Sequence, residues 1–185
     1  MKDLKFFNFR GLKMSFLSDA EIRELISQEP PLVEKFIDLD TQAQPNGFEM
    51  TAAEIYELEG AGAVDFDNSG RKTSSKKLLD FDGDGWVHLN PGIYSVVLNE
   101  VVNIPKNIGA VAYHRSSLVR SGVVLGTAVW DAGYSGRSEC LIIVQNPAGF
   151  DLKKNARIMQ LLFFRLGTDA DKLYRGIYQN ENMKS

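Results

Sequence analysis

The residue types best suited to chemistry lie in one stretch, residues 113–136. Arg115 carries a planar fork of donors that matches the oxygen atoms of a phosphate group. Ser116 and Ser117 follow it with two hydroxyl groups, and their backbone N–H groups can form an anion-binding turn. Asp131 stands fifteen positions after Ser116, directly behind an apolar run, and a carboxylate at such a core edge is a candidate general base or water-orienting group. The stretch therefore suits a phosphate-bearing ligand and an activated water.

A purely structural explanation fits the same residues, and residue types alone favour it. Arg115 and Asp131 would form an ion pair, and the serines would cap a turn. Gly126 interrupts a valine-rich segment that favours β-structure, so a hairpin or a bulge is predicted there. In this explanation Gly126 is only a bend in the chain.

Length, charge and cysteine count limit the class of protein. The 185 residues predict one domain, 1–185, with a core of its own. A formal net charge of −3 disfavours general nucleic-acid binding. Cys140 is the single cysteine, which excludes an internal disulfide and fits a reducing cytoplasm. No apolar run approaches the ~20 residues of a membrane span, and the basic, aromatic start (residues 1–17) lacks a cleavable signal pattern, so we expect a cytoplasmic protein without membrane partners.

A helix is predicted over residues 18–28, before the stretch with the candidate chemistry. Ser18 and Glu21 have the spacing of a capping box, in which each side chain accepts from the other residue's backbone. Apolar residues at positions 22, 25 and 26 form one face. Two prolines at positions 30 and 31 end the helix.

Most of the remaining chain has the alternating pattern of strands. The pattern predicts strands at residues 86–89, 92–100, 110–113 and 140–144, and a core strand over 161–166. The polar, basic segment 68–77 is predicted to be an exposed loop. Many short strands separated by proline and glycine indicate an all-β protein, a barrel or jelly roll, here with the small N-terminal helix.

Two patterns suggest metal sites but fail on closer inspection. Residues 80–85 begin like a calcium-binding EF-hand loop, yet the twelfth position is Pro91, where a bidentate glutamate is needed. We therefore interpret them as an acidic hairpin turn. His88 and His114 are the only histidines, and two distant histidines without cysteine partners make a poor metal site.

Four segments in order resemble the signature motifs of the dUTP diphosphatase (dUTPase) and dCTP deaminase superfamily. They are Gln-Pro-Asn-Gly-Phe-Glu-Met-Thr (44–51), Arg-Ser-Ser-Leu (115–118), Asp-Ala-Gly-Tyr-Ser-Gly (131–136) and Lys-Asn-Ala-Arg-Ile-Met-Gln-Leu (154–161). Asn155 and Met159 depart from the usual glycine and alanine of the last motif. The tail Tyr-Arg-Gly-Ile-Tyr-Gln (174–179) and the phrase Ala-Val-Trp-Asp-Ala-Gly-Tyr (128–134) are similar to the archaeal-type dUTPases.

The resemblance implies a distorted jelly roll of the dUTPase-like β-clip type and a homotrimer with its sites between subunits. It implies hydrolysis of dUTP to dUMP and pyrophosphate with Mg²⁺, by water attack on the α-phosphorus. Asp131 would activate the water, and Glu49 would hold the hydrated magnesium through water. The substrate-binding residues implied are Arg115, Ser116, Ser117, Arg120, Gly126, Tyr134, Arg157, Gln160, Tyr178 and Gln179. The tail, residues 170–185, would be a flexible arm that closes over the nucleotide; an unstructured tail is the alternative.

Three other functions remain open. In the deaminases a glutamate in the strand after the third motif activates water, whereas here apolar residues 141–144 cover that position and Glu139 precedes it. The first alternative is nevertheless dCTP deamination, alone or beside dUTP hydrolysis. The second is a related diphosphatase for another deoxynucleotide. The third is a non-catalytic nucleotide-binding trimer. Glu49 itself has a structural alternative, a solvated strand carboxylate.

Overall fold

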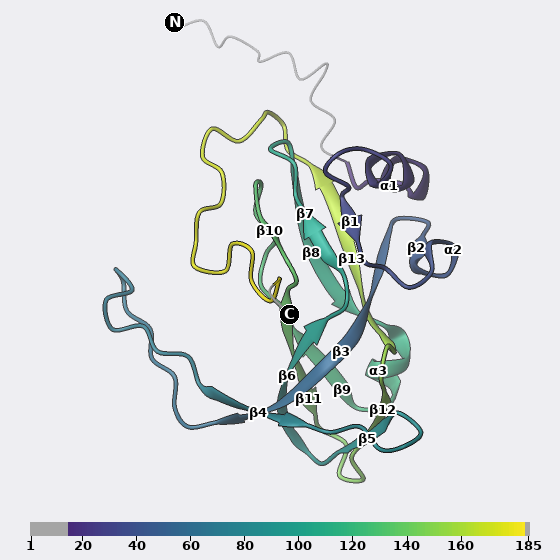
Figure 1. The fold of residues 1–185 in the computed structure, drawn as a ribbon, viewed down its shortest axis with the longest axis vertical. Coiled ribbons are helices and arrows are strands. Elements are labelled where there is room, and N and C mark those ends of the chain that lie inside the picture. Colours follow the sequence, from purple (N-terminus) through teal and green to yellow (C-terminus); the bar gives the residue numbers. More distant parts are fainter. Residues whose placement is uncertain (1–14, 184–185) are drawn as a thin grey trace, which may run out of the picture.

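The computed structural model describes residues 15–183, and most of the basic, aromatic start lies outside the described residues (Figure 1). The helices are α1 (Asp19–Ile26), α2 (Leu39–Gln42) and α3 (Ser116–Arg120). The strands are β1 (Val33–Glu34), β2 (Ala43–Gln44), β3 (Gly47–Glu59), β4 (Ser75–Leu79), β5 (Trp86–Leu89), β6 (Gly92–Leu98), β7 (Val101–Asn103), β8 (Ile108–His114), β9 (Val123–Gly126), β10 (Ser135–Gly136), β11 (Glu139–Val144), β12 (Phe150–Lys153) and β13 (Arg157–Arg165). Strands dominate, which confirms the predicted all-β class.

One large antiparallel sheet organises the molecule. Its strand order is β8-β13-β3-β6-β11-β9, with β2 and β4 paired to β3 outside this path. Two small sheets, β1-β7-β10 and β12-β5, complete the structure. The long strand β3 is the centre: its first half pairs with β13 and its second half with β6 and β4. Because the sheet curls around it, the buried apolar side chains of β3, β6, β11 and β13 form one core.

The predicted N-terminal helix is present as α1. The Ser18 hydroxyl accepts from the Glu21 backbone N–H, and the Glu21 carboxylate accepts from the Ser18 backbone N–H. The capping box is thus confirmed. Ile22 is fully buried and Arg165 of β13 donates to Glu21 at 3.0 Å, so the helix is fixed to the sheet.

The predicted exposed loop at residues 68–77 is wrong at its end. Ser75, Lys76 and Lys77 belong to β4, which pairs with β3 from Ile55 to Glu59. Their side chains are solvent-facing, so the sequence lacks an apolar alternation, but the backbone still forms the ladder. Residues 60–74 between β3 and β4 extend away from the barrel (Figure 1).

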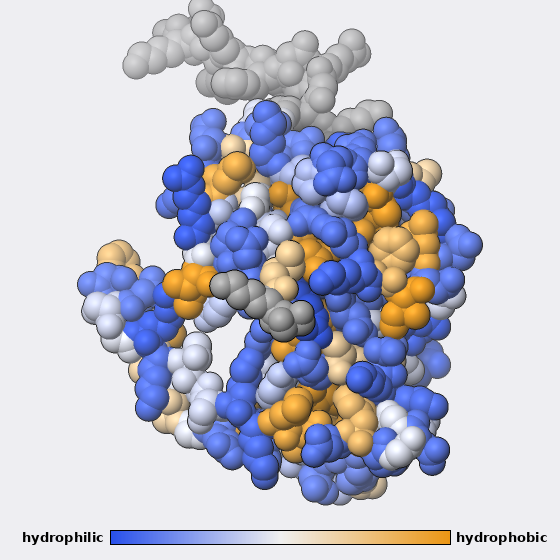
Figure 2. All heavy atoms as spheres, in the orientation of Figure 1, coloured by the Kyte–Doolittle hydropathy of each residue, from blue (hydrophilic) through white to orange (hydrophobic). Residues whose placement is uncertain are grey.

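The acidic segment before β5 is a turn but not the predicted hairpin, because β4 pairs with β3 and β5 pairs with β12. The Asp82 carboxylate accepts from the backbone N–H groups of Asp84 and Trp86, and Gly85 has φ +81°. None of the helices within residues 15–183 has the length and apolar character needed to cross a bilayer. The face seen in Figure 2 is mainly hydrophilic, with separate hydrophobic patches.

Candidate functional site

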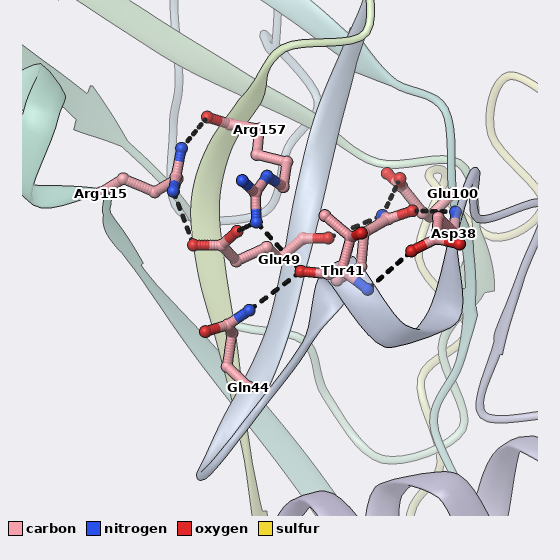
Figure 3. A network of polar contacts seen from close by, with 8 residues as sticks. Asp38, Thr41, Gln44, Glu49, Glu100, Arg115 and Arg157 are labelled. Carbon is pink, nitrogen blue, oxygen red and sulfur yellow. Dashed lines mark hydrogen bonds and ion pairs between the residues drawn. The ribbon is translucent and has the colours of Figure 1, made fainter.

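An ion-pair cluster of Glu49, Arg115 and Arg157 lies where β3, β8 and β13 meet; we call it the arginine clamp. Arg115 Nε donates to Glu49 Oε1 at 2.6 Å, and Arg157 Nη1 donates to Glu49 Oε2 at 2.7 Å. Figure 3 shows the Glu49 carboxylate between the two guanidinium groups. Glu49 is only 6% exposed, so it is not a solvated strand carboxylate. The ion pair between Arg115 and Asp131 expected from the structural explanation is replaced by this pairing.

Local strand geometry explains the clamp. Glu49 lies opposite Gln160 in the β3–β13 ladder, and Gln160 lies opposite Tyr113 in the β13–β8 ladder. Arg115 follows the end of β8 and donates its backbone N–H to the carbonyl of Ile158. The neighbouring strands therefore bring three motifs that are far apart in sequence to one end of the sheet.

A cavity of about 350 Å³ opens beside the clamp. It is lined by Glu49, Arg115, Ser116 and Gln160, together with Asn46, Tyr113, His114 and Leu162. The first four were predicted from the sequence, and the structure brings them together. Sequence reasoning gave His114 no role and treated Asn46 only as a turn residue. Strand register is the information that places Asn46 and His114 in the cavity. Asn46 accepts a hydrogen bond from Gln160 Nε2 at 3.3 Å, and His114 lies opposite Met159 in the β8–β13 ladder, next to Arg115.

The two serines of the second motif face different spaces. They begin α3, a short helix where the sequence suggested a turn. Ser116 lines the clamp cavity, whereas Ser117 lines another cavity of about 390 Å³ beside Arg157 and Trp86. Arg120 ends α3 and is exposed outside the clamp cavity. The predicted phosphate contacts of Ser117 and Arg120 thus have less geometric support than that of Ser116.

Asp131 lies in a separate group of residues. It is exposed and directly follows the buried Trp130, which forms an isolated bridge with Ala110 of β8. A cavity of about 270 Å³ contains Asp131, Tyr134 and Glu139 with residues of the tail. Five residues of extended backbone, roughly 16 Å, separate Ala110 from Arg115. Within one chain, the clamp and Asp131 therefore line different cavities.

Tyr134 is held by hydrogen bonds beside Asp131. Its hydroxyl lies 2.8 Å from Ser138 Oγ and donates to Glu181 Oε1 at 2.8 Å. Trp130 Nε1 also donates to Ser138 Oγ, at 2.7 Å. Burial, above all, raises the pKa of Tyr134 far above its usual range, so the hydroxyl stays protonated. These hydrogen bonds hold the ring of Tyr134 in place, and the residue is only 6% exposed.

The tail lies against the third motif of its own chain. Gln179 accepts from the Ser135 backbone N–H and donates to the Gly133 carbonyl. Tyr174 packs edge-to-face on Tyr134, with ring centroids 5.6 Å apart. Tyr178 lines the Asp131 cavity. Closure of the predicted arm over a nucleotide stays a prediction.

Glu139 is the first residue of β11 and shares a face with Leu141. Its carboxylate accepts from Lys76 Nζ and from Ser95 Oγ. Burial works against ionisation, but these bonds outweigh it and lower the pKa of Glu139. Leu141 pairs with Gly126 in a regular β9–β11 ladder, without the bulge considered from sequence. The side chain two residues further along β11, on the same face as Glu139, is therefore the apolar Leu141.

The fold and cavities define a strand-rich barrel protein with a polar cavity at one end of its sheet. The family model described as dCTP deaminase-like matches residues 16–166, and the chain belongs to this family. It is 61% identical over 92% of its length to the whole of a probable deoxyuridine 5'-triphosphate nucleotidohydrolase of Methanococcoides burtonii. It is 37% identical over 76% of its length to 88% of a deoxyuridine 5'-triphosphate nucleotidohydrolase of Methanocaldococcus jannaschii.

A solved structure supports the fold. The chain superposes on the 2'-deoxycytidine 5'-triphosphate deaminase of Agrobacterium tumefaciens with a TM-score of 0.61 at 21% identity. The match covers 82% of this chain and 48% of the deaminase chain. At this identity the likeness concerns architecture, and it agrees with the jelly-roll class predicted from the sequence.

Proposed function

We propose that the protein hydrolyses dUTP to dUMP and pyrophosphate. The observation that carries the proposal is the clamp cavity, where Arg115, Ser116 and Gln160 offer cationic, hydroxyl and amide donors at one end of the sheet. Such donors suit the oxygens of a triphosphate. The high identity to proteins named dUTP nucleotidohydrolases, across nearly the whole chain, selects dUTP as the nucleotide.

In the proposed reaction Asp131 orients a water and takes its proton as the water attacks the α-phosphorus. Its exposure leaves the carboxylate accessible to substrate and water. Arg115, Ser116 and Gln160 hold the phosphates, with Ser117 and Arg120 at the margin. Arg157 keeps Glu49 and Arg115 in place. Tyr134 lies against the deoxyribose, and the β9 backbone near Gly126 offers its polar groups to uracil. Tyr178 and Gln179 belong to the arm that would cover the nucleotide.

Magnesium is expected to arrive on the triphosphate. Within residues 15–183 no cluster of three histidine, cysteine or acidic side chains could hold a metal. Both Glu49 oxygens already accept from arginines, so a direct metal bond would compete with the clamp. A water-mediated contact fits, because each carboxylate oxygen can accept a further hydrogen bond and Mg²⁺ keeps several waters. When bound, the ion neutralises phosphate charge.

A homotrimer would complete the site. The clamp and Asp131 line different cavities of one chain, so a second copy that brings its Asp131 to the clamp would unite them. We place this enzyme in the cytoplasm, with dUTP and its own copies as partners and without nucleic-acid or membrane partners.

Substrate discrimination tests the proposed function. Purified protein is offered dUTP, UTP, dCTP and dTTP with magnesium, and kcat/KM is measured for each by release of pyrophosphate. We expect dUTP to exceed the other three by at least about two orders of magnitude. Equal rates for UTP would contradict the role of Tyr134, and preference for another deoxynucleotide would indicate the related diphosphatase.

dCTP deamination is the second candidate, because Glu139 lines the same cavity as Asp131. Its bonds from Lys76 and Ser95 and the apolar Leu141 weigh against it as a water-activating base. Release of ammonia from dCTP would favour this function. Tight dUTP binding without any product would favour the non-catalytic trimer.

A further inference from the structure

Glu100 is a buried carboxylate that no step above uses. It lies in the connection between β6 and β7 and is 0% exposed. Within the described part of the chain no lysine, arginine or histidine forms a salt bridge with it. Burial raises its pKa, because the charged form loses hydration. A group that is this costly to bury needs donors that offset the lost water.

Three neutral donors surround Glu100. Gln42 Nε2 and Thr51 Oγ1 donate to Oε1 at 2.7 and 2.6 Å, and the Thr51 backbone N–H donates to Oε2 at 2.9 Å. All three donors come from residues of α2 and β3. The carboxylate therefore joins these two elements at a single point.

The bond to the Thr51 N–H compensates for an irregularity in β3. The β3–β13 ladder shifts register between Arg157 and Met159, which lie opposite Thr51 and Met50. On the other side, the β3–β6 ladder shifts between Ala52 and Glu54. Backbone groups at such bulges lose their ladder partners. Glu100 accepts the Thr51 N–H at this bulge, and so stabilises the irregular stretch of β3.

The same network reaches the arginine clamp. Gln42 Nε2, besides its bond to Glu100, donates to the Glu49 carbonyl at 2.8 Å. Thr51 is the register partner of Arg157, and Glu49 stands two residues before it on β3. In Figure 3 Glu100 lies in the same polar network as Glu49, Arg115 and Arg157. A shift of β3 at Thr51 would consequently move two members of the clamp.

We propose that Glu100 is a positioning residue that sets the arginine clamp for binding the triphosphate. It touches neither the clamp side chains nor their cavity, and acts through Gln42 and Thr51. The inference rests on the proposed function for its substrate, but its binding test with tripolyphosphate does not. It predicts a defect confined to recognition of the phosphates.

The test is Glu100→Gln, which keeps the shape and removes the charge. The amide NH₂ of the variant must face a donor in either orientation. In one orientation it faces Gln42 Nε2 and Thr51 Oγ1, and in the other it faces the Thr51 backbone N–H. We expect KM for dUTP to rise about tenfold with kcat changed less than about threefold. Calorimetry with inorganic tripolyphosphate and magnesium should show the same loss of affinity. Affinity for deoxyuridine should stay at the wild-type value.

Two further variants serve as a stability control and as a second test of the network around Glu100. Val96→Ala, in the core of β6, lowers thermal stability away from the clamp and should leave tripolyphosphate binding unchanged. Thr51→Val removes the hydroxyl that donates to Glu100 and accepts from Asn99 Nδ2, but it keeps the carboxylate and the backbone N–H, so it should fold if Glu100→Gln does not. We expect Thr51→Val to weaken tripolyphosphate binding by about threefold.

The outcomes separate the two proposals. A wild-type protein that binds tripolyphosphate but does not hydrolyse dUTP refutes the proposed function, and Glu100 is then judged by binding alone. A folded Glu100→Gln or Thr51→Val variant with wild-type tripolyphosphate affinity overturns the inference. Equal losses for deoxyuridine and tripolyphosphate, or a wild-type protein that binds no tripolyphosphate, overturn it as well.

Discussion

Two carboxylates with opposite surroundings characterise the site at the residue scale. Glu49 is enclosed by the guanidinium groups of Arg115 and Arg157, whereas Asp131 is exposed at the end of an apolar run. An enclosed carboxylate fixes cations, and an exposed one can meet a water and a substrate. This difference is the physical reason for proposing that Glu49 holds the two arginines of the clamp and that Asp131 is the base.

Asp131→Asn tests the assignment of the base. The amide keeps the size of the side chain but cannot take a proton, so dUTP should bind within about threefold of the wild-type affinity while kcat falls by about 10²–10⁴. Calorimetry with dUTP and a pyrophosphate-release assay give the two numbers. Near-normal turnover in this variant would remove Asp131 from the role.

At the element scale, the strands β5, β6, β8, β11 and β13 overlap the segments predicted from the sequence, whereas the central strand β3 is not among the predictions. The alternation at residues 86–89 and the apolar run before Val144 predict β5 and β11, because one or both faces of these strands are buried. Strand β4 could not be predicted in this way, since Lys76 and Lys77 present no buried face. The clamp was also missed. Ion pairs between Glu49 and residues more than sixty positions away depend on the order and register of the strands, which the sequence pattern does not give.

Gly47 links the β2–β3 turn to the site. A Cβ atom there would lie 2.6 Å from the Leu161 carbonyl oxygen and 2.8 Å from Gln160 Nε2. Gly47→Ala should therefore cost about 1–3 kcal/mol of unfolding free energy and raise KM for dUTP by displacing Gln160. Urea unfolding and steady-state kinetics measure the two effects. Gly83→Ala is the matched control, because its Cβ meets nothing within 4 Å, and an equal effect in both variants would refute the steric explanation.

The α1 capping box predicts a pH dependence. The backbone hydrogen bond from Ser18, and next the side-chain hydrogen bond from Arg165, lower the pKa of Glu21 from its ordinary value of 4.5. A lowered folded-state pKa means that the stabilisation is complete above pH 4.5 and lost as pH falls through the folded value. Wild type should thus be more stable than Glu21→Gln at pH 6, with the gap closing toward pH 3. Urea unfolding at both values checks this, and a constant gap would contradict it.

At the scale of the whole molecule, the separation of the clamp from Asp131 makes the arrangement of copies decisive. We expect sedimentation equilibrium to give three times the chain mass of 20.6 kDa. Trimers reassembled from equal amounts of Asp131→Asn and Arg115→Ala chains should recover about a quarter of wild-type activity, since one site in four combines an intact clamp with an intact Asp131 from a neighbour. No recovery in mixed trimers would mean that each site lies within one chain.

Product analysis in heavy-oxygen water shows which phosphorus of dUTP the water attacks. Purified protein is given dUTP with magnesium, and in parallel dCTP, and the products are identified by mass spectrometry. Attack on the α-phosphorus predicts equal amounts of dUMP and pyrophosphate, the heavy oxygen in dUMP alone, and no ammonia from dCTP. Heavy oxygen in pyrophosphate, ammonia from dCTP, or no dUMP at all would contradict dUTP hydrolysis by attack on the α-phosphorus.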